Sequence, residues 1–600
     1  MAIVSIPVFD EKDNYVFIPA CCYDGNRFDV VSRAYPPMFT PEEARIDMPV
    51  TLTILPKLNK DFSGKIEVTS GDAATPCVGV FSKTRQRAIL VFTLQEIQGE
   101  NIGLAYENHK ITLTWPARRE YIYRAMNTML ENEQVWTDKP AEIPYKILDF
   151  ECKSLAEFFR TFFENRRIMG MDDTRPSILP FKEQFEIQRH KFNTLNWHES
   201  GFYMIGTDRT HFQVWQPGWC GGSVSGYPLM QLGGEREYAR QRQTLDFLFS
   251  TQTECGLFHG IVDNDGNIFE DGFTIDGNNK GCEDWHLIRK TADTLYYLFK
   301  DFSFIQQREG AVPAAYVAGA KRAADRFVAL WQRYGQFGQF VNVYTGELIV
   351  GGSTCAAIAP GALAKAYEFY GEKAYIDTAK ESAEFFYRAF LSKGYTTGGP
   401  GEILQAVDSE SGAGLLESYV TLYELSNEEK WLRYARECAE YLSSWVMSYN
   451  YRFPKDSEFG RLGMKTVGSV FANLQNKHSA PGLCIYSGLS IFKLWKWTGD
   501  ELYLQLVKDI ALTISQYMST EDRPIYDRKM TAEERQSDDP AVWERHRLMA
   551  GFINERVNTS DWEGENNVGG VFNGSCWCET SNLLALCEVV PALEAENLLP

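Results

Sequence analysis

Acidic residues stand in two groups whose spacing suits proton transfer. Glu283 and Asp284 directly precede Trp285, and Asp408 and Glu410 lie two residues apart. Acid–base catalysis needs one protonated and one ionised carboxyl group, so the two environments must separate their pKa values. A dry position against an aromatic ring raises the pKa of a carboxyl group. These acids are therefore the first candidates for catalysis.

A structural role is the alternative for each group, because an acid before a helix commonly caps it or balances its dipole. Glu417 is different, since it falls inside an apolar helical pattern, where a buried acid needs a specific reason. His478 ends a run rich in Asn and Gln and is a further candidate for proton transfer. Glu417 and His478 therefore join the catalytic candidates.

Aromatic residues are abundant: 14 Trp, 30 Tyr and 38 Phe make up 14% of the chain. Aromatic rings fill hydrophobic cores, and they also stack on flat apolar ligand faces such as sugar rings. Several tryptophans and polar residues lie near the acidic segments. The candidates for substrate binding are Trp219, Trp285, Asn476, Trp577 and Glu579.

An internal repeat indicates the elements that position these residues. Similar tight turns follow an apolar helical segment and precede an amphipathic one, which is the pattern of a helical hairpin. Gly or Asn ends the first helix, and acidic residues suit the start of the second. A looser copy spans residues 285–331, and a last apolar helix at 581–590 needs a partner from the N-terminal part. The tight turns are residues 234–238, 371–375, 427–431 and 499–503.

The connections between hairpins are long, whereas those within hairpins are short. Loops longer than about 12–15 residues are uncommon unless they are functional. All the long ones join an outer helix to the next inner helix, so they gather where the inner helices begin. We expect the site at that end. The long connections are residues 251–282, 334–353, 392–412, 447–481 and 519–578.

The N-terminal part has a different pattern. Residues 1–118 contain short alternating runs rich in Val, Ile and Thr, separated by turn residues, which predict an antiparallel β-sandwich. Residues 119–204 are expected to form a helical linker and loop region, with helices at 121–136 and 155–168. Residues 205–600 would then form a toroid of helical hairpins.

This layout resembles the six-hairpin glycosidase superfamily of (α/α)6 barrels, many of which carry an N-terminal β-sandwich joined by a helical linker. The resemblance is architectural and assigns no numbered family. It implies a mainly α fold with a β domain, namely an N-terminal antiparallel β-sandwich and an (α/α)6 toroid. It also implies an acid and a base that face each other on loops or inner helices.

The function expected from the resemblance and the acids is hydrolysis of glycosidic bonds in an oligosaccharide by a carboxylate pair. We expect an exo-acting enzyme, and Arg209, Lys280 and Lys477 suggest a uronate-bearing substrate. One alternative is a polysaccharide or oligosaccharide lyase that uses His478 with Asn473 or Asn476 in β-elimination. Another is a non-catalytic carbohydrate-binding protein. Only 8 histidines are present, which disfavours a sugar epimerase that uses paired histidines.

Composition and charge exclude several classes of binding partner. A net charge of -20 argues against nucleic-acid binding, and the lack of a long apolar run argues against a membrane span. Met1–Val8 lacks a basic segment, which favours a cytoplasmic location. The 13 cysteines contain no CxxC pair, so we expect reduced thiols and no metal. No cofactor motif is found, and homo-oligomer formation is left open.

Overall fold

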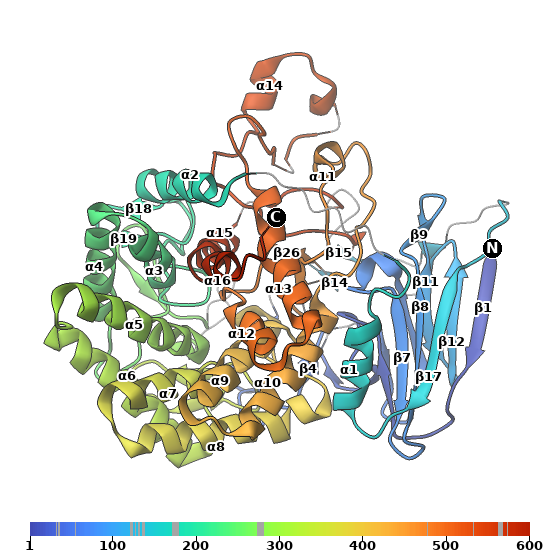
Figure 1. Ribbon diagram of the computed structural model, residues 1–600, viewed down its shortest axis with the longest axis horizontal. Coiled ribbons are helices and arrows are strands. Elements are labelled where there is room, and N and C mark those ends of the chain that lie inside the picture. Colours follow the sequence, from blue (N-terminus) through green and yellow to red (C-terminus); the bar gives the residue numbers. More distant parts are fainter. Residues whose placement is uncertain are drawn as a thin grey trace.

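The chain is mainly helical, with separate antiparallel sheets near the N-terminus (Figure 1). In Figure 1 the strands at the N-terminal end are blue, and the helices of the rest run from green to red. The computed structural model describes residues 1–31, 33, 37–53, 56–119, 124–125, 128–129, 133–134, 139–170, 179–272, 281–476, 478–527, 529–531, 533–561, 568–572 and 574–599.

Two antiparallel sheets occupy the N-terminal part and share one hydrophobic cluster. Val16, Val80 and Val91 of one sheet are buried with Val68 and Leu113 of the other. The strand runs predicted from the alternating pattern are thus confirmed. The first sheet has the order β1 (Ala2–Pro7), β12 (Lys110–Trp115), β11 (Gly103–Glu107), β6 (Gly64–Thr69) and β5 (Lys57–Leu58). The second has the order β17 (Tyr145–Glu151), β8 (Arg87–Thr93), β7 (Cys77–Ser82) and β2 (Asn14–Phe17).

The second sheet is covered on its other face by α1 (Leu155–Asn165), which explains why every residue of β7 is buried. Gly79 allows this close packing, because a Cβ there would lie 2.8 Å from the Phe158 ring. Phe17 contacts Phe158 and Phe162 edge to face. α1 also packs against α10 (Glu429–Leu442), so one helix joins the sheets to the helical ring.

Apolar helices form a closed inner ring. Each packs against the next, and the last returns to the first. The last member, α15, continues through a π-helical turn at Ala585–Val589 into α16 (Val590–Ala595), and that turn contacts α12. In ring order the helices are α3 (Ser223–Leu232), α5 (Ile288–Glu309), α7 (Ala359–Tyr370), α9 (Glu410–Ser426), α12 (Leu489–Thr498) and α15 (Trp577–Leu584).

An outer helix packs against each inner one, so the predicted hairpins are confirmed. Gly371, Asn427 and Gly499 end their inner helices with φ of 74°, 53° and 69°, the left-handed geometry that favours Gly and Asn. The last inner helix, α15, packs against α2, so its partner does come from the N-terminal part. The outer helices are α4 (Glu235–Ser250), α6 (Ala314–Tyr334), α8 (Lys373–Ala389), α10, α13 (Glu501–Thr513) and α2 (Phe181–Thr194).

The helix predicted at residues 121–136 is wrong for the residues that are described there. They form short strands: β14 (Arg124–Ala125) pairs with β15 (Thr128–Met129), and β16 (Glu133–Gln134) pairs with β13 (Arg118–Arg119). Backbone pairing outweighs the local helical pattern. Among the described helices, none combines the length and apolar character that a membrane span requires.

Tyr23 holds the N-terminal part against the ring. Its ring stacks on Trp445 at 4.7 Å between centroids, and its hydroxyl lies 2.8 Å from Ser444 Oγ. We expect Tyr23→Ala to lower the free energy of unfolding by about 3–5 kcal/mol, because a large buried ring is lost. Tyr23→Phe should cost only about 1 kcal/mol, because one hydrogen bond is lost.

Guanidinium unfolding followed by tryptophan fluorescence measures both changes. Tyr145→Ala is the control, since Tyr145 is exposed on β17. Equal unfolding midpoints for Tyr23→Ala and Tyr145→Ala would show that the stacked ring does not hold the two parts together.

Candidate active site

A cavity of about 500 Å³ lies at the end of the ring where the inner helices begin. Glu410 opens α9 and Trp577 opens α15, while Cys220 and Cys484 precede α3 and α12. Aromatic rings and ionisable groups both line it, and Met38 adds a wall from the N-terminal part. The aromatic lining is Phe212, Trp219, Phe572 and Trp577, and the acidic lining is Asp208, Asp271, Glu402, Glu410 and Glu555.

Part of the predicted site meets in this cavity. Trp219, Glu410, Asn476, His478 and Trp577 all line it, although they come from four separate segments of the chain. The long connections bring them together at the end predicted from the hairpin pattern. Their roles remain predictions, and the geometry gives each a definite environment.

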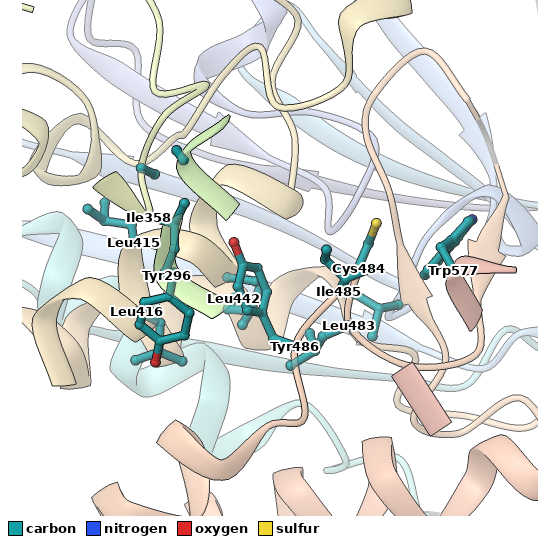
Figure 2. Close-up of a cluster of buried hydrophobic side chains, with 14 of the residues drawn as sticks. Tyr296, Ile358, Leu415, Leu416, Leu442, Leu483, Cys484, Ile485, Tyr486 and Trp577 are labelled. Carbon is teal, nitrogen blue, oxygen red and sulfur yellow. The ribbon is translucent and has the colours of Figure 1, made fainter. Parts of the chain in front are cut away.

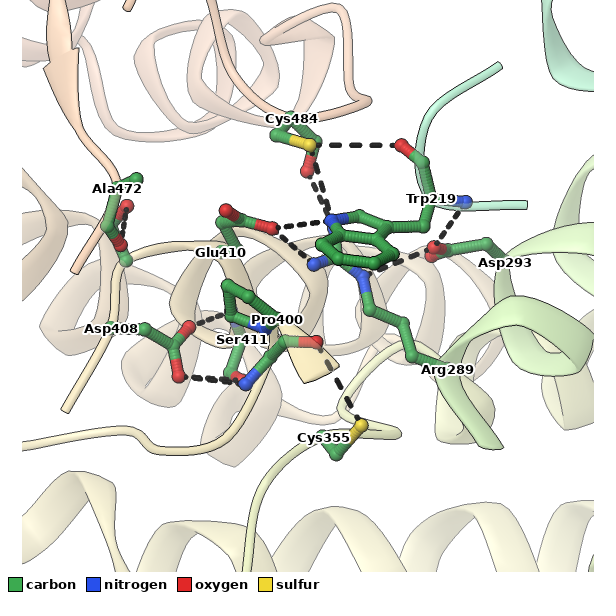
Figure 3. Close-up of polar contacts among 12 residues, drawn as sticks. Trp219, Arg289, Asp293, Cys355, Pro400, Asp408, Glu410, Ser411, Ala472 and Cys484 are labelled. Atoms are coloured by element: carbon green, nitrogen blue, oxygen red, sulfur yellow. Dashed lines mark hydrogen bonds and ion pairs between the residues drawn. The ribbon is translucent and has the colours of Figure 1, made fainter. Parts of the chain in front are cut away.

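Glu410 is held by a buried guanidinium (Figure 3). Its Oε2 forms an ion pair with Arg289 Nη1 and accepts a hydrogen bond from Trp219 Nε1 at 3.1 Å. Its Oε1 makes no hydrogen bond with a described residue. One oxygen of Glu410 is therefore fixed by Arg289 and Trp219, on a carboxylate that lines the cavity.

Arg289 is shared among several partners. Its Nε donates to Asp293 Oδ2 at 3.1 Å, one turn further along α5, and its Nη2 donates to the Cys484 carbonyl at 2.9 Å. Burial lowers the pKa of the guanidinium, but Glu410 and Asp293 outweigh it and hold the pKa well above its ordinary value. Arg289 therefore stays charged and fixes three elements around the cavity.

Trp219 has a constrained backbone, with φ of 57°. Bulky residues rarely adopt this left-handed geometry, and such residues cluster at functional sites. Asp293 Oδ2 accepts the Trp219 N–H at 3.3 Å, and Asp293 Oδ1 accepts from the Tyr486 hydroxyl at 2.8 Å. The indole is thus oriented by the same network that holds Glu410.

Glu402 is the second carboxyl group of interest. Burial and, to a lesser extent, the negative charge of Glu410 together raise its pKa to about 8. Its Oε2 is buried with no hydrogen-bond partner among the described residues. The environment of Glu402 therefore favours the protonated form, whereas Glu410 forms an ion pair with Arg289.

Asp408 is buried just before the start of α9 and does not line the cavity. Its carboxylate accepts from the backbone N–H groups of Gly399 at 2.9 Å and Ser411 at 2.6 Å, and thus caps the start of α9. Burial raises its pKa to about 7, although these two hydrogen bonds lower it. The capping alternative for Asp408 matches this geometry.

The group at residues 283–285 also lies apart from the cavity lining. Glu283 is exposed and accepts from the Gly281 N–H at 2.8 Å, and Asp284 accepts from Asn342 Nδ2. Trp285 is buried on β22 (Trp285–Leu287), with its ring 5.7 Å from that of Phe340. These contacts match the structural alternative.

Two further predicted acids lie elsewhere. Glu417 lines a second cavity at the other end of the ring. Glu579 forms a buried ion pair with Lys191 at 2.7 Å, which ties α15 to α2. Of the basic residues suggested for uronate binding, Arg209 is exposed and pairs with Glu199 at 2.9 Å. Lys280 and Lys477 fall outside the described residues.

Sequence reasoning did not select Glu402, Glu555, Arg556 or Arg289. Glu555 accepts from the Ser575 N–H at 2.7 Å, and Arg556 stacks over Phe572 at 4.0 Å. Arg289 had a usable signal, because a basic residue four positions before Asp293 in an apolar helix suggests a buried pair. Glu402 had none beyond its place in a long connection.

A group of metal-ligand type lies beside the cavity. Glu270, Asp271 and His286 offer ligand atoms within 4.8 Å of one another. However, Lys290 Nζ lies 2.5 Å from Asp271 Oδ1, and His259 and His286 bond the two Glu270 oxygens at 2.6 and 3.0 Å. Burial raises the pKa of Glu270, but these histidines lower it more. The Lys290 ammonium and the two imidazoles thus already contact the carboxylate oxygens that a cation would bind.

Comparison with known proteins concerns the fold. No family model matches the sequence, and no curated protein matches it. A family 76 glycoside hydrolase from a bovine Bacteroides thetaiotaomicron strain is 13% identical, with 87% of this chain and 97% of that chain covered and a TM-score of 0.41. A cellobiose 2-epimerase from Bacillus thermoamylovorans is 12% identical, with 69% and 98% covered and a TM-score of 0.42.

A polysaccharide lyase is 11% identical, with 69% of this chain and 98% of that chain covered and a TM-score of 0.36. A D-mannose isomerase is 12% identical, with 70% of this chain and 100% of that chain covered and a TM-score of 0.42. These similarities assign no family to the chain. The ring is established by its own helix contacts, not by these neighbours.

We expect Arg289→Met to lower the free energy of unfolding by about 3–5 kcal/mol, because it leaves Glu410 and Asp293 as uncompensated buried charges. Adding Glu410→Gln should recover at least about 1 kcal/mol of this loss, since the two residues are coupled. Guanidinium unfolding of both single variants and the double variant measures the coupling.

Arg388→Met is the control, because its pair with Glu384 lies on the outer surface. That change should cost no more than about 1 kcal/mol. If the losses in free energy of unfolding caused by Arg289→Met and Glu410→Gln simply add in the double variant, the two side chains are not energetically coupled. That result would contradict a stabilising ion pair between them.

Proposed function

We propose that the protein is a glycoside hydrolase that cleaves an oligosaccharide in the first cavity, with Glu402 as the general acid and Glu410 as the ionised carboxylate. The observation that carries this proposal is the difference between two acids in one cavity. The pKa of Glu402 is raised to about 8, while Glu410 is paired with Arg289. Opposed environments for two carboxyl groups are what glycoside hydrolysis requires.

In the proposed reaction Glu402 donates its proton to the glycosidic oxygen as the bond to the anomeric carbon breaks. Glu410 Oε1 acts at the anomeric carbon in one of two ways. It is either a general base that activates a water molecule for attack on this carbon, or a nucleophile that attacks the carbon directly. Arg289 and Trp219 act on Oε2 and position the carboxylate. Water supplies the hydroxyl group of the product. If Glu410 attacks directly, the water proton returns to Glu402; if Glu410 activates the water, Glu410 takes this proton, and exchange with solvent restores both carboxyl groups.

The lining of the cavity supports an exo-acting enzyme on a uronate-bearing substrate. Trp219 and Trp577 offer ring faces for sugar stacking, and Arg556 offers a guanidinium that suits a carboxylate. Met38, from the N-terminal part, forms part of the cavity wall. We also propose that the two N-terminal sheets form a β-sandwich that completes this wall.

A lyase is the second candidate, because His478 and Asn476 both line the cavity. In that reaction His478 would take the proton next to a uronate carboxylate, and the bond to the leaving oxygen would break by β-elimination. The product is unsaturated and absorbs ultraviolet light, whereas hydrolysis gives only a new reducing end. The two reactions can therefore be told apart in one assay.

We expect Glu402→Gln to lower kcat by about 10²–10⁴-fold on the best substrate from a panel of aryl glycosides and oligosaccharides, because the proton donor is lost. For the wild-type protein, kcat/KM should fall as pH rises through about 8, since Glu402 is deprotonated above its pKa. Reducing-sugar release and ultraviolet absorbance are followed together.

Glu283→Gln is the matched control and should keep the wild-type rate, because Glu283 is exposed away from the cavity. Ultraviolet absorbance that requires His478 and survives Glu402→Gln would establish the lyase instead. Binding of the sugars without turnover by the wild-type protein would support the non-catalytic alternative.

A further inference from the structure

A second cavity, also of about 500 Å³, lies at the opposite end of the ring. Five inner helices contribute to it, mostly through their middle and C-terminal turns, although α12 contributes from its first turn. The π-helical turn after α15 adds Glu588. Small-molecule sites typically have volumes of about 300–1,000 Å³. The residues that matter here are Tyr227, Tyr296, Lys300, Lys365, Lys493 and Glu588.

The two cavities are separated by a buried layer. Figure 2 shows Leu483, Ile485 and Tyr486 in the hydrophobic cluster between Tyr296, which lines the second cavity, and Trp577, which lines the first. Inner helix α5 also holds the backbone of residues 483–486, because the Tyr297 hydroxyl donates a hydrogen bond to the Ile485 carbonyl at 2.7 Å. The second cavity is thus a separate space.

Two of its lysines are already neutralised. Lys300 Nζ lies 2.7 Å from Glu588 Oε1, and Glu588 also accepts from the hydroxyls of Ser487 at 2.6 Å and Tyr227 at 3.2 Å. Lys493 Nζ lies 2.7 Å from Glu424 Oε1. These pairs form a polar wall whose charges are balanced.

Lys365 has no such counter-ion. Its ammonium lies 5.3 Å from the Tyr296 ring and makes no ion pair with a described residue. Burial lowers the pKa of Lys365, and the positive charge of Lys300 lowers it further. Glu368 and Glu424 also line the cavity and raise this pKa through their negative charge, but neither forms an ion pair with Lys365 in the described part of the chain. Glu417 also lines the cavity, where it accepts a hydrogen bond from the Tyr296 hydroxyl at 3.2 Å and makes no ion pair with Lys365 within the described residues. A partly buried cation without a partner is costly unless a ligand pairs with it.

We propose that the second cavity binds a small ring-shaped anion, a sugar carboxylate or a sugar phosphate, with its charged group on Lys365. The ring of the ligand lies against Tyr296 and Phe299, both of which line the cavity. The hydroxyls of the ligand form hydrogen bonds with the ion-paired side chains of the polar wall, such as Lys300 and Glu588. This site does not depend on the reaction proposed for the first cavity.

Isothermal titration calorimetry with glucuronate, glucose 6-phosphate, glucose and inorganic phosphate tests the site. We expect at least one of the anionic sugars to bind at least about tenfold more tightly than glucose, and the comparison between them identifies the anion. Lys365→Met should weaken that binding about tenfold or more, because a charge-assisted hydrogen bond is lost.

Lys373→Met is the matched control on outer helix α8, where Lys373 pairs with Asp377 at the surface. It should bind the probe as the wild-type protein does, and so should Glu402→Gln in the first cavity. Ser303→Trp fills the second cavity without removing a charge and should also abolish binding. Absence of saturable binding, loss of binding in Glu402→Gln, or unchanged affinity in Lys365→Met or Ser303→Trp would overturn the proposal.

Discussion

The buried guanidinium of Arg289 is the interaction on which the rest of the site depends. A charge in a protein interior is tolerated only when it is paired and its hydrogen bonds are made. Arg289 meets this requirement with Glu410 on α9, Asp293 on α5 and the carbonyl of Cys484 before α12. One side chain therefore fixes three members of the inner ring. It also aims Glu410 at the cavity and, through Asp293, orients Trp219.

The same pairing explains why two nearby acids differ. Glu410 forms the ion pair with Arg289, whereas Glu402 lies at the cavity wall, where desolvation and the charge of Glu410 raise its pKa. Burial and like-charge repulsion both favour the neutral form of a carboxyl group. Neither residue would have this character alone. The difference between the two acids follows from the ion pairs of Arg289 with Glu410 and Asp293. The helical ring holds these three side chains in fixed positions.

The helical hairpins were predictable because their signals are local. Gly371, Asn427 and Gly499 end helices at positions where the left-handed geometry is needed, and the apolar pattern on each side is strong. The site was predictable only as a region. Glu410 and Glu417 lie on one face of α9, but seven residues along a helix span about 10 Å. They consequently face different cavities at opposite ends of the ring. Glu402 and Glu410 line the cavity, whereas Asp408 does not. This difference depends on the path of the connection through residues 401–410, which the sequence does not give.

A direct measurement of the Glu402 pKa tests the central claim. Carbon-13 NMR of protein labelled at the glutamate carboxyl carbon, compared between the wild-type protein and Glu402→Gln, isolates the signal of this residue. We expect this signal to titrate with a pKa of about 8. A signal that titrates near the ordinary value of 4.5 would contradict it, because Glu402 would then be ionised at neutral pH and could not act as the acid.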